Sequence, residues 1–435
     1  MESPIKKTIN GIDVYYIISN KFKTVTWSLN FMHEAGVSNI NEYYFLSNIL
    51  LDNMKHYPSN EKKYRYLSYL YGLEAFGSAK SLGKNIVNQF VVTYPNELYI
   101  KGENDLSVNA FKFLIDIIMN PKMRNGNFTK KVLNDSFEEA NQLFGILKSI
   151  KDMHAYYNYT KVFYQDKSGL EYNFPEKELL EKVNLETLLK AYKDFFEKDK
   201  ISIFVTGNID VDKFDNIIKD NLPSVFEDRN IDVARKDFNH NFEYIPKVIK
   251  EYYNVSQSRV FVGYLTNAKY LSNKHAAASV FNDIFGGFDQ SLLFNTIREE
   301  LNLAYYVDSH YLPDEQLVTV SVSCEVKNED MVVEKIKSIL KDIKDGNFTD
   351  QIFNQAKDSC VNSLYSINDS QTSYLLQHIK NYQLNNEKYD LETRIKAYQS
   401  VTKEDVIRIA NNLVLDTVYI YTKKGDQLAN SKSSK

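Results

Sequence analysis

Several features that identify common classes of protein are missing from this sequence. Its 435 residues include only two cysteines, Cys324 and Cys360, which excludes a disulfide-dense secreted scaffold and fits a reducing compartment. No apolar run approaches the roughly 20 residues of a membrane-spanning helix. The first residues, MESPIKKTINGIDVYY, contain no apolar signal core. We therefore expect a cytoplasmic protein that makes no use of a membrane.

The chain also has no excess of charge of one sign. Its formal net charge is -4, so nothing favours electrostatic attraction to nucleic acid or to anionic lipid. The residues that are present suit a globular protein, because 43% are hydrophobic and 25% are charged. A chain of this length is too long for one ordinary domain and allows two domains of about 200 residues each.

The first half of the sequence alternates between patterns typical of strands and of helices. Residues 12–18 and 24–32 predict two strands joined as a hairpin. Further elements follow in order. They are helices at 41–54 and 61–72, a strand at 85–95, helices at 103–119, 127–150 and 185–197, and a strand beginning at residue 200.

The second half repeats this order. Strands are predicted at 258–265, 304–312 and 316–326, with helices at 273–285 and 289–302. Both halves end in a helix, a short gap and a strand, and Thr402 and Asp405 have the spacing of a capping box. We therefore predict an α+β fold of two homologous units, each an antiparallel sheet flanked by helices. The units are expected at 1–225 and 246–435, with a polar linker at 226–245.

One stretch of the second unit carries a resemblance to a known family. Between residues 285 and 311 a glycine pair precedes a helix with Phe and Arg-Glu, and a Leu-x-Tyr sequence leads into a strand. In order, these residues are Gly286, Gly287, Phe294, Arg298, Glu299, Leu303 and Tyr305. Together with the two-unit pattern, this stretch resembles the insulinase/pitrilysin family of zinc peptidases, from about residue 10 to residue 425.

The resemblance implies a zinc motif that this chain has lost. Active members carry His-x-x-Glu-His on the first long helix, where two imidazoles bind zinc and the glutamate activates water. The best register puts Tyr44 and Asn48 on the histidines and Ser47 on the glutamate. A third ligand, a glutamate, is absent from residues 140–159, and Glu138 and Glu139 lie just upstream. We expect no metal in this chain and no peptide hydrolysis by the chain alone.

The histidines support the same expectation without the family. None of the seven is three or four residues from another, as a helical zinc motif requires. His33, which precedes Glu34 at the end of a strand, is expected to be a surface or loop residue rather than a metal ligand.

Of the family's functional residues, this chain retains an arginine and a tyrosine. In the family such a pair binds the substrate backbone across a cavity from the zinc, and here it is Arg298 and Tyr305. A guanidinium and a phenol can both donate hydrogen bonds to a peptide carbonyl. The alternative from the residues alone is that Arg298 forms an ion pair with Glu299, Glu300 or Asp308 and that Tyr305 packs in a core.

Two further features of the second unit carry a weaker signal. The Gly286-Gly287 pair lacks the residues of a phosphate-binding loop and is expected to form a flexible turn. The strand at 258–265 could be an edge that pairs with an extended peptide, or a central strand of the second unit.

The resemblance implies one function and leaves alternatives open. The first is a non-catalytic, substrate-binding subunit of a bacterial heterodimeric zinc metallopeptidase, in which Arg298 and Tyr305 complete a site whose zinc is held by a homologous His-x-x-Glu-His partner. The second is a peptide-binding or structural scaffold of the same fold. The third is an independent metalloenzyme with unusual ligands.

Overall fold

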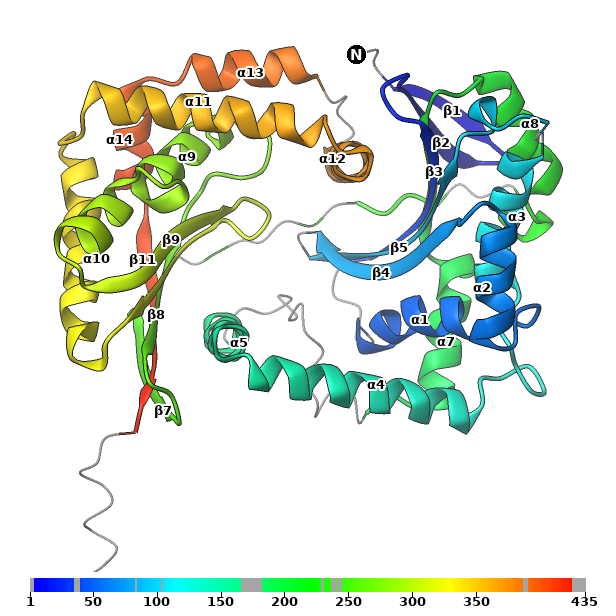
Figure 1. Ribbon diagram of the computed structural model, residues 1–435, viewed down its shortest axis with the longest axis horizontal. Coiled ribbons are helices and arrows are strands. Elements are labelled where there is room, and N and C mark those ends of the chain that lie inside the picture. The colour runs from blue at the N-terminus through cyan, green and yellow to red at the C-terminus, as the bar shows by residue number, and fades with distance from the viewer. Residues whose placement is uncertain are drawn as a thin grey trace, which may run out of the picture. The chain divides into compact units, whose positions relative to one another are not determined.

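The computed structural model describes residues 4–34, 40–82, 84–102, 105–165, 182–227, 231–234, 236, 240, 245–385 and 390–424. These residues form two compact units (Figure 1). Unit 1 comprises residues 1–144, 171–236 and 367–389, and unit 2 comprises residues 145–170, 237–366 and 390–435. Much of the predicted linker at 226–245, including 228–230, 237–239 and 241–244, lies outside the described residues.

The first half of the chain supplies the sheet of unit 1 and most of its helices. Its elements are β1 (Ile5–Ile9), β2 (Ile12–Ile18), β3 (Thr24–His33), α1 (Ile40–Asp52), α2 (Asn60–Tyr69), β4 (Glu74–Leu82), β5 (Asn85–Pro95), α3 (Leu106–Met119), α4 (Lys130–Ser149), α5 (Lys151–Tyr164), α7 (Leu185–Glu197), β6 (Lys200–Gly207) and α8 (Val211–Asn221). Most strands and helices predicted from the sequence are present, with ends that differ by a few residues.

The second half supplies the sheet of unit 2. Its elements are β7 (Lys247–Tyr253), β8 (Ser258–Leu265), α9 (His275–Asn282), η3 (Asp283–Gly287), η4 (Phe294–Glu300), β9 (Ala304–Leu312), β10 (Leu317–Cys324), α10 (Glu329–Lys344), α11 (Asp350–Ile367), α12 (Gln371–Asn385), α13 (Leu391–Gln399), α14 (Lys403–Asn411) and β11 (Val414–Lys423). The capping box predicted at Thr402 and Asp405 is confirmed at the start of α14.

The two sheets have the same strand connections, except that unit 1 has one extra edge strand, β1. The order is β1-β2-β6-β3-β5-β4 in unit 1 and β7-β11-β8-β10-β9 in unit 2. All neighbours are antiparallel except β2 with β6 and β7 with β11, which are parallel. The predicted α+β fold of two units with antiparallel-dominated sheets is therefore confirmed.

One prediction of strand pairing was wrong, and the two alternatives left open for the strand at 258–265 are now decided. β2 and β3 do not form a hairpin, because β6 lies between them and pairs with both. Likewise, β8 is not an edge strand, since β11 and β10 pair with its two sides. The reading of β8 as a central strand is therefore correct.

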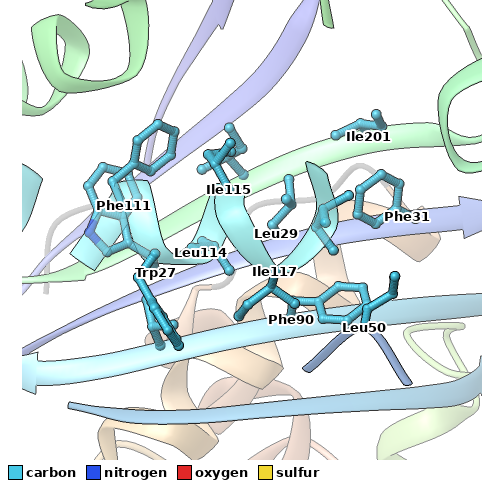
Figure 2. Packing of buried hydrophobic residues seen from close by; sticks show 14 of the residues in the cluster. Trp27, Leu29, Phe31, Leu50, Phe90, Phe111, Leu114, Ile115, Ile117 and Ile201 are labelled. Carbon is cyan, nitrogen blue, oxygen red and sulfur yellow. The ribbon is translucent and has the colours of Figure 1, made fainter. Parts of the chain in front are cut away.

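One face of the unit 1 sheet carries the main core. Trp27, Leu29 and Phe31 alternate along β3 and point toward the helices (Figure 2), because side chains on a strand face one side at every second residue. The ring of Trp27 lies 4.8 Å from that of Phe111 on α3. Its indole N–H donates to the hydroxyl of Tyr94 at 3.1 Å, which satisfies the polar group of a fully buried side chain.

The opposite face of each sheet is more polar and packs against one helix from the other half of the sequence. In unit 1 this helix is α12, whose Gln371 donates to the carbonyls of Thr24 and Thr206 at 3.0 and 3.1 Å. In unit 2 it is α5, whose Tyr159 stacks on Phe261 with ring centroids 5.0 Å apart. The two units thus interleave along the sequence, while the homologous domains proposed for residues 1–225 and 246–435 stay a prediction.

Candidate functional site

The residues in register with the zinc motif lie on α1 and differ in their burial. Ser47 is 1% exposed and lies at the buried side of the helix. Asn48 is exposed, and Tyr44 is half-buried. Burial raises the pKa of the Tyr44 phenol, which disfavours the phenolate that a metal would need.

Ser47 belongs instead to a chain of buried polar contacts. Asn88 on β5 donates to the Oγ of Ser47 and to the carbonyl of Tyr43, both at 2.7 Å. These two bonds orient the amide, so its Oδ1 accepts from the Nε2 of His33 at 2.8 Å. The other ring nitrogen of His33 lies 2.6 Å from the carboxylate of Asp199. This Ser47–Asn88–His33–Asp199 chain connects α1 to the sheet.

The expectation that His33 is a surface or loop residue was therefore wrong. Its side chain is 1% exposed at the end of β3, and its ring stacks on Tyr43 with centroids 3.5 Å apart. Both ring nitrogens have a polar neighbour within 2.8 Å. Both ring nitrogens therefore face oxygen atoms of the protein rather than an open coordination position.

These residues do not fit zinc. Structural and catalytic zinc ions are held by thiolates, imidazoles and carboxylates, and Tyr44, Ser47 and Asn48 provide none of these. Glu138 and Glu139, on α4, are exposed. No group of three His, Cys, Asp or Glu side chains suitable for a metal occurs within the described residues.

Arg298 lies in η4, a π-helical segment that packs against β9 in unit 2. Its guanidinium lies 4.8 Å from the ring centroid of Phe294, and its Nε is 3.5 Å from the carboxylate of Glu299. The side chain is 44% exposed. The pair with Glu299 is one of the ion pairs that the residues alone suggested, and an exposed pair of this length holds the arginine weakly.

Tyr305 stands at a bulge near the start of β9. Tyr306 pairs with Ser323 on β10 and Ala304 pairs with Cys324, so Tyr305 is an extra residue between two consecutive pairs. Its ring is 57% exposed, and its hydroxyl donates to Glu325 at 3.4 Å. Tyr305 is therefore not a core residue, and a bulge commonly re-aims a side chain in this way.

The glycine pair has a packing role. The flexible turn expected at Gly286 and Gly287 is wrong, since both residues end the π-helical segment η3. A Cβ on Gly286 would lie 2.8 Å from the Oγ of Ser309 on β9 and 2.8 Å from a methyl group of Leu293. A glycine at this position lets η3 approach β9 closely.

A cavity that the sequence did not reveal lies on the polar face of the unit 2 sheet. Its volume is about 550 Å³, and it lies between α5 and strands β8, β9 and β10. Three polar side chains at every second position of β9 line it, namely Tyr306, Asp308 and His310. That alternation is visible in the sequence, but the position of α5 over these strands is not.

Comparisons with known proteins agree with the family that the sequence resembles. Residues 182–360, which include Arg298 and Tyr305, match the family model described as the peptidase M16 inactive domain. M16 is the peptidase family of insulinase and pitrilysin. The chain is 25% identical over 421 residues to the probable inactive metalloprotease YmfF of Bacillus subtilis (strain 168), and the match covers 95% of this chain and 96% of that protein.

Solved structures have the same fold. A conserved protein from Enterococcus faecalis V583 superposes with a TM-score of 0.89 at 22% identity, covering 97% of this chain and 99% of that one. A peptidase M16 inactive domain from Pseudomonas fluorescens superposes with a TM-score of 0.76 at 13% identity, covering 97% and 98%. No helix within the described ranges is long and apolar enough to cross a membrane.

We expect the purified chain to contain no stoichiometric zinc and to hydrolyse no peptide on its own. The physical reason is that Tyr44, Ser47 and Asn48 offer neither an imidazole pair nor a base for water. Elemental analysis after equilibration with zinc and desalting tests this directly. About one zinc per chain, lost in Tyr44→Phe or Asn48→Ala, would contradict the register on α1.

The buried polar chain through His33 is expected to stabilise unit 1. Removing one member of a buried pair leaves its partner unsatisfied, so Asp199→Ala should lower the free energy of unfolding by about 3–5 kcal/mol. Urea denaturation of the full chain measures this. The control is Asp232→Ala, whose carboxylate is 83% exposed and pairs with Lys200 at 2.7 Å; it should cost at most about 1 kcal/mol. Equal losses in both variants would be evidence against the structural role of Asp199.

Proposed function

We propose, on the premise that this chain is a homologue of the M16 peptidases and of their inactive type, that it is the non-catalytic, substrate-binding subunit of a heterodimeric zinc metallopeptidase. The partner would be a homologous chain with an intact His-x-x-Glu-His motif, and the substrate a peptide. The observation that carries this proposal is an asymmetry within the chain. The zinc positions on α1 are filled by residues that do not fit a metal, whereas Arg298 and Tyr305 are present and exposed.

The chemistry of the two side chains supports a role in trans. Arg298 carries a permanent charge with several N–H donors, and Tyr305 has a phenolic donor. Their present partners, Glu299 and Glu325, are bound at 3.5 and 3.4 Å, distances at which exposed polar contacts are weak. A peptide carbonyl could therefore compete for both donors at little cost.

In this proposal the two chains contribute different groups to one site. The partner holds the zinc ion and the base that activates water, and this chain contributes donors that bind the substrate backbone. A donor directed at a carbonyl oxygen that becomes negative during the reaction stabilises the transition state more than the ground state. In this proposal Arg298 and Tyr305 thus affect the rate of the pair although this chain has no catalytic metal.

The alternative is a peptide-binding or structural scaffold of the same fold with no peptidase partner. It also predicts that α1 binds no zinc, but in a scaffold Arg298 and Tyr305 would have no effect on any reaction. The two functions are separated by whether a zinc-bearing homologue encoded beside this chain associates with it.

We expect co-expression with such a homologue to give a heterodimer with peptidase activity toward short or unfolded peptides. Neither chain alone should show the full activity, because each would hold only part of the site. Size-exclusion chromatography with light scattering gives the mass of the complex, and cleavage of a fluorogenic peptide library gives the activity. If an active preparation contains only separate monomers, the heterodimer is wrong and the scaffold function gains support.

Substituting the two donors should reduce activity without preventing assembly. Arg298→Ala and Tyr305→Phe are each expected to lower kcat/KM of the pair by about 10²–10³, the typical loss of a donor to a developing oxyanion. A change in KM alone would instead indicate ground-state binding. Chromatography of each variant with its partner verifies assembly.

Two matched control variants carry the same kinds of substitution at exposed residues outside the proposed site. Tyr252→Phe removes a hydroxyl from a tyrosine on β7 that is 56% exposed. Arg408→Ala removes an arginine that is 67% exposed and pairs with Asp405 on its own helix, much as Arg298 pairs with Glu299. Both should retain full activity. Full activity in Arg298→Ala and Tyr305→Phe as well would show that these two residues do not contribute to the site.

A further inference from the structure

The cavity of unit 2 is lined by charged, hydroxyl-bearing and aromatic side chains. It lies between α5 and strands β8, β9 and β10, and each of these four elements contributes side chains to its lining. All four elements belong to unit 2. A volume of about 550 Å³ is within the range of sites that hold a small ligand or a large side chain.

The one arginine in the lining is already paired. The Nε of Arg259 donates to the carboxylate of Asp152 on α5, and its Nη1 lies 3.3 Å from the carbonyl of Ser258. The arginine side chain is 17% exposed. Because this positive charge is compensated by Asp152, the cavity offers little attraction to an anion.

Asp308 is the carboxylate that is not fully compensated. Its Oδ2 accepts from the hydroxyl of Tyr306 at 2.5 Å and lies 2.7 Å from the Nε2 of His310. Its Oδ1 is buried and has no hydrogen-bond partner among the described residues. A carboxylate oxygen in that situation is costly unless a donor or a cation satisfies it.

Aromatic rings stand beside this carboxylate. Tyr156 and Phe261 line the cavity with ring centroids 6.0 Å apart, and Tyr306 adds a third ring. Burial raises the pKa of Tyr156 to about 12, so its phenol remains neutral near pH 7. Aromatic faces next to a carboxylate favour a cation that has apolar surface of its own, and a planar guanidinium stacks on such faces.

We propose that this cavity binds the arginine-type side chain of a peptide substrate, with the carboxylate of Asp308, whose side chain is 18% exposed, as the counter-ion and the rings of Tyr156 and Phe261 as walls. The inference rests on the proposed function only in taking a peptide as the ligand. The hydroxyls of Ser321 and Ser323 on β10 offer further acceptors for the guanidinium N–H groups. The site would give the subunit a preference for basic peptides.

His310 makes this binding depend on pH. Its hydrogen bond to Asp308 raises the pKa of His310 above its ordinary value. Below that pKa the imidazolium neutralises Asp308 and repels a second cation, whereas above it the carboxylate is available. The other charged or titratable groups facing the cavity are Asp152 and Tyr156 on α5, Arg259 on β8 and Tyr306 on β9, while β10 contributes no titratable group. Affinity for a cation should therefore rise as the pH increases through the pKa of His310.

The test uses the full chain and two kinds of probe. One is agmatine, which carries a guanidinium and an ammonium group on a butyl chain and has no peptide backbone. The other is a pair of short acetylated peptide amides that differ only in arginine or its neutral isostere citrulline. Isothermal titration calorimetry should give the arginine peptide about 10- to 100-fold higher affinity than the citrulline peptide, the range expected for one charge-assisted hydrogen bond.

Variants of the chain test whether Asp308 causes the preference for the arginine peptide. Asp308→Asn should remove it, while Asp350→Asn, whose carboxylate is 86% exposed and pairs with Lys403, should keep it. His310→Gln should keep the preference and lose its pH dependence, which provides a second readout if Asp308→Asn fails to fold. Circular dichroism verifies the fold of each variant.

The outcomes separate this site from the proposed function. Equal affinity for the arginine and citrulline peptides would overturn the proposal, even if agmatine binds, and so would an unchanged preference in a folded Asp308→Asn variant. These measurements need no partner chain. An inactive mixed pair would therefore refute the peptidase function, whereas the loss of arginine preference would refute only this cavity.

Discussion

The insertion of a late strand into the middle of each sheet is the constraint on which the rest of the structure depends. β6 lies between β2 and β3, and β11 lies between β7 and β8. Each inserted strand is parallel to one neighbour and antiparallel to the other. The first strands of a unit therefore cannot form their final sheet until the last one is in place. With the sheet complete, one face packs its helices and the other remains polar, and the cavity of unit 2 lies on that polar face.

The sheet of unit 1 also holds α1 in place through buried polar contacts. In unit 1 the polar groups near α1 are used inside the protein, where Asn88 joins Ser47 to His33 and His33 meets Asp199. Buried polar groups are stable when every member has a partner. In unit 2, η3 approaches β9 closely at Gly286, and the side chains of Arg298 on η4 and Tyr305 at the β9 bulge are exposed.

Local patterns in the sequence identified most elements but not their long-range neighbours. β2 and β3 were found from their alternating residues, whereas their separation by β6 depends on a segment far along the chain. His33 was misjudged for the same reason, since Asn88 and Asp199 are distant in sequence and a single histidine carries no sign of them. The family pattern located Arg298 and Tyr305, whose exposure could not be read from it. The cavity was missed because it needs α5 to lie over strands that come more than ninety residues later.

The placement of α12 has a consequence for biosynthesis. This helix is Gln371–Asn385, yet it belongs to unit 1, where its Gln371 binds two carbonyls and its Tyr382 ring lies 4.5 Å from Tyr15. A ribosome that has translated β6 has supplied every strand of the unit 1 sheet but not the helix that covers its polar face. That face therefore stays uncovered while most of unit 2 is being synthesised, so a nascent chain or a gene fragment that stops at the linker exposes it to chaperones and proteases.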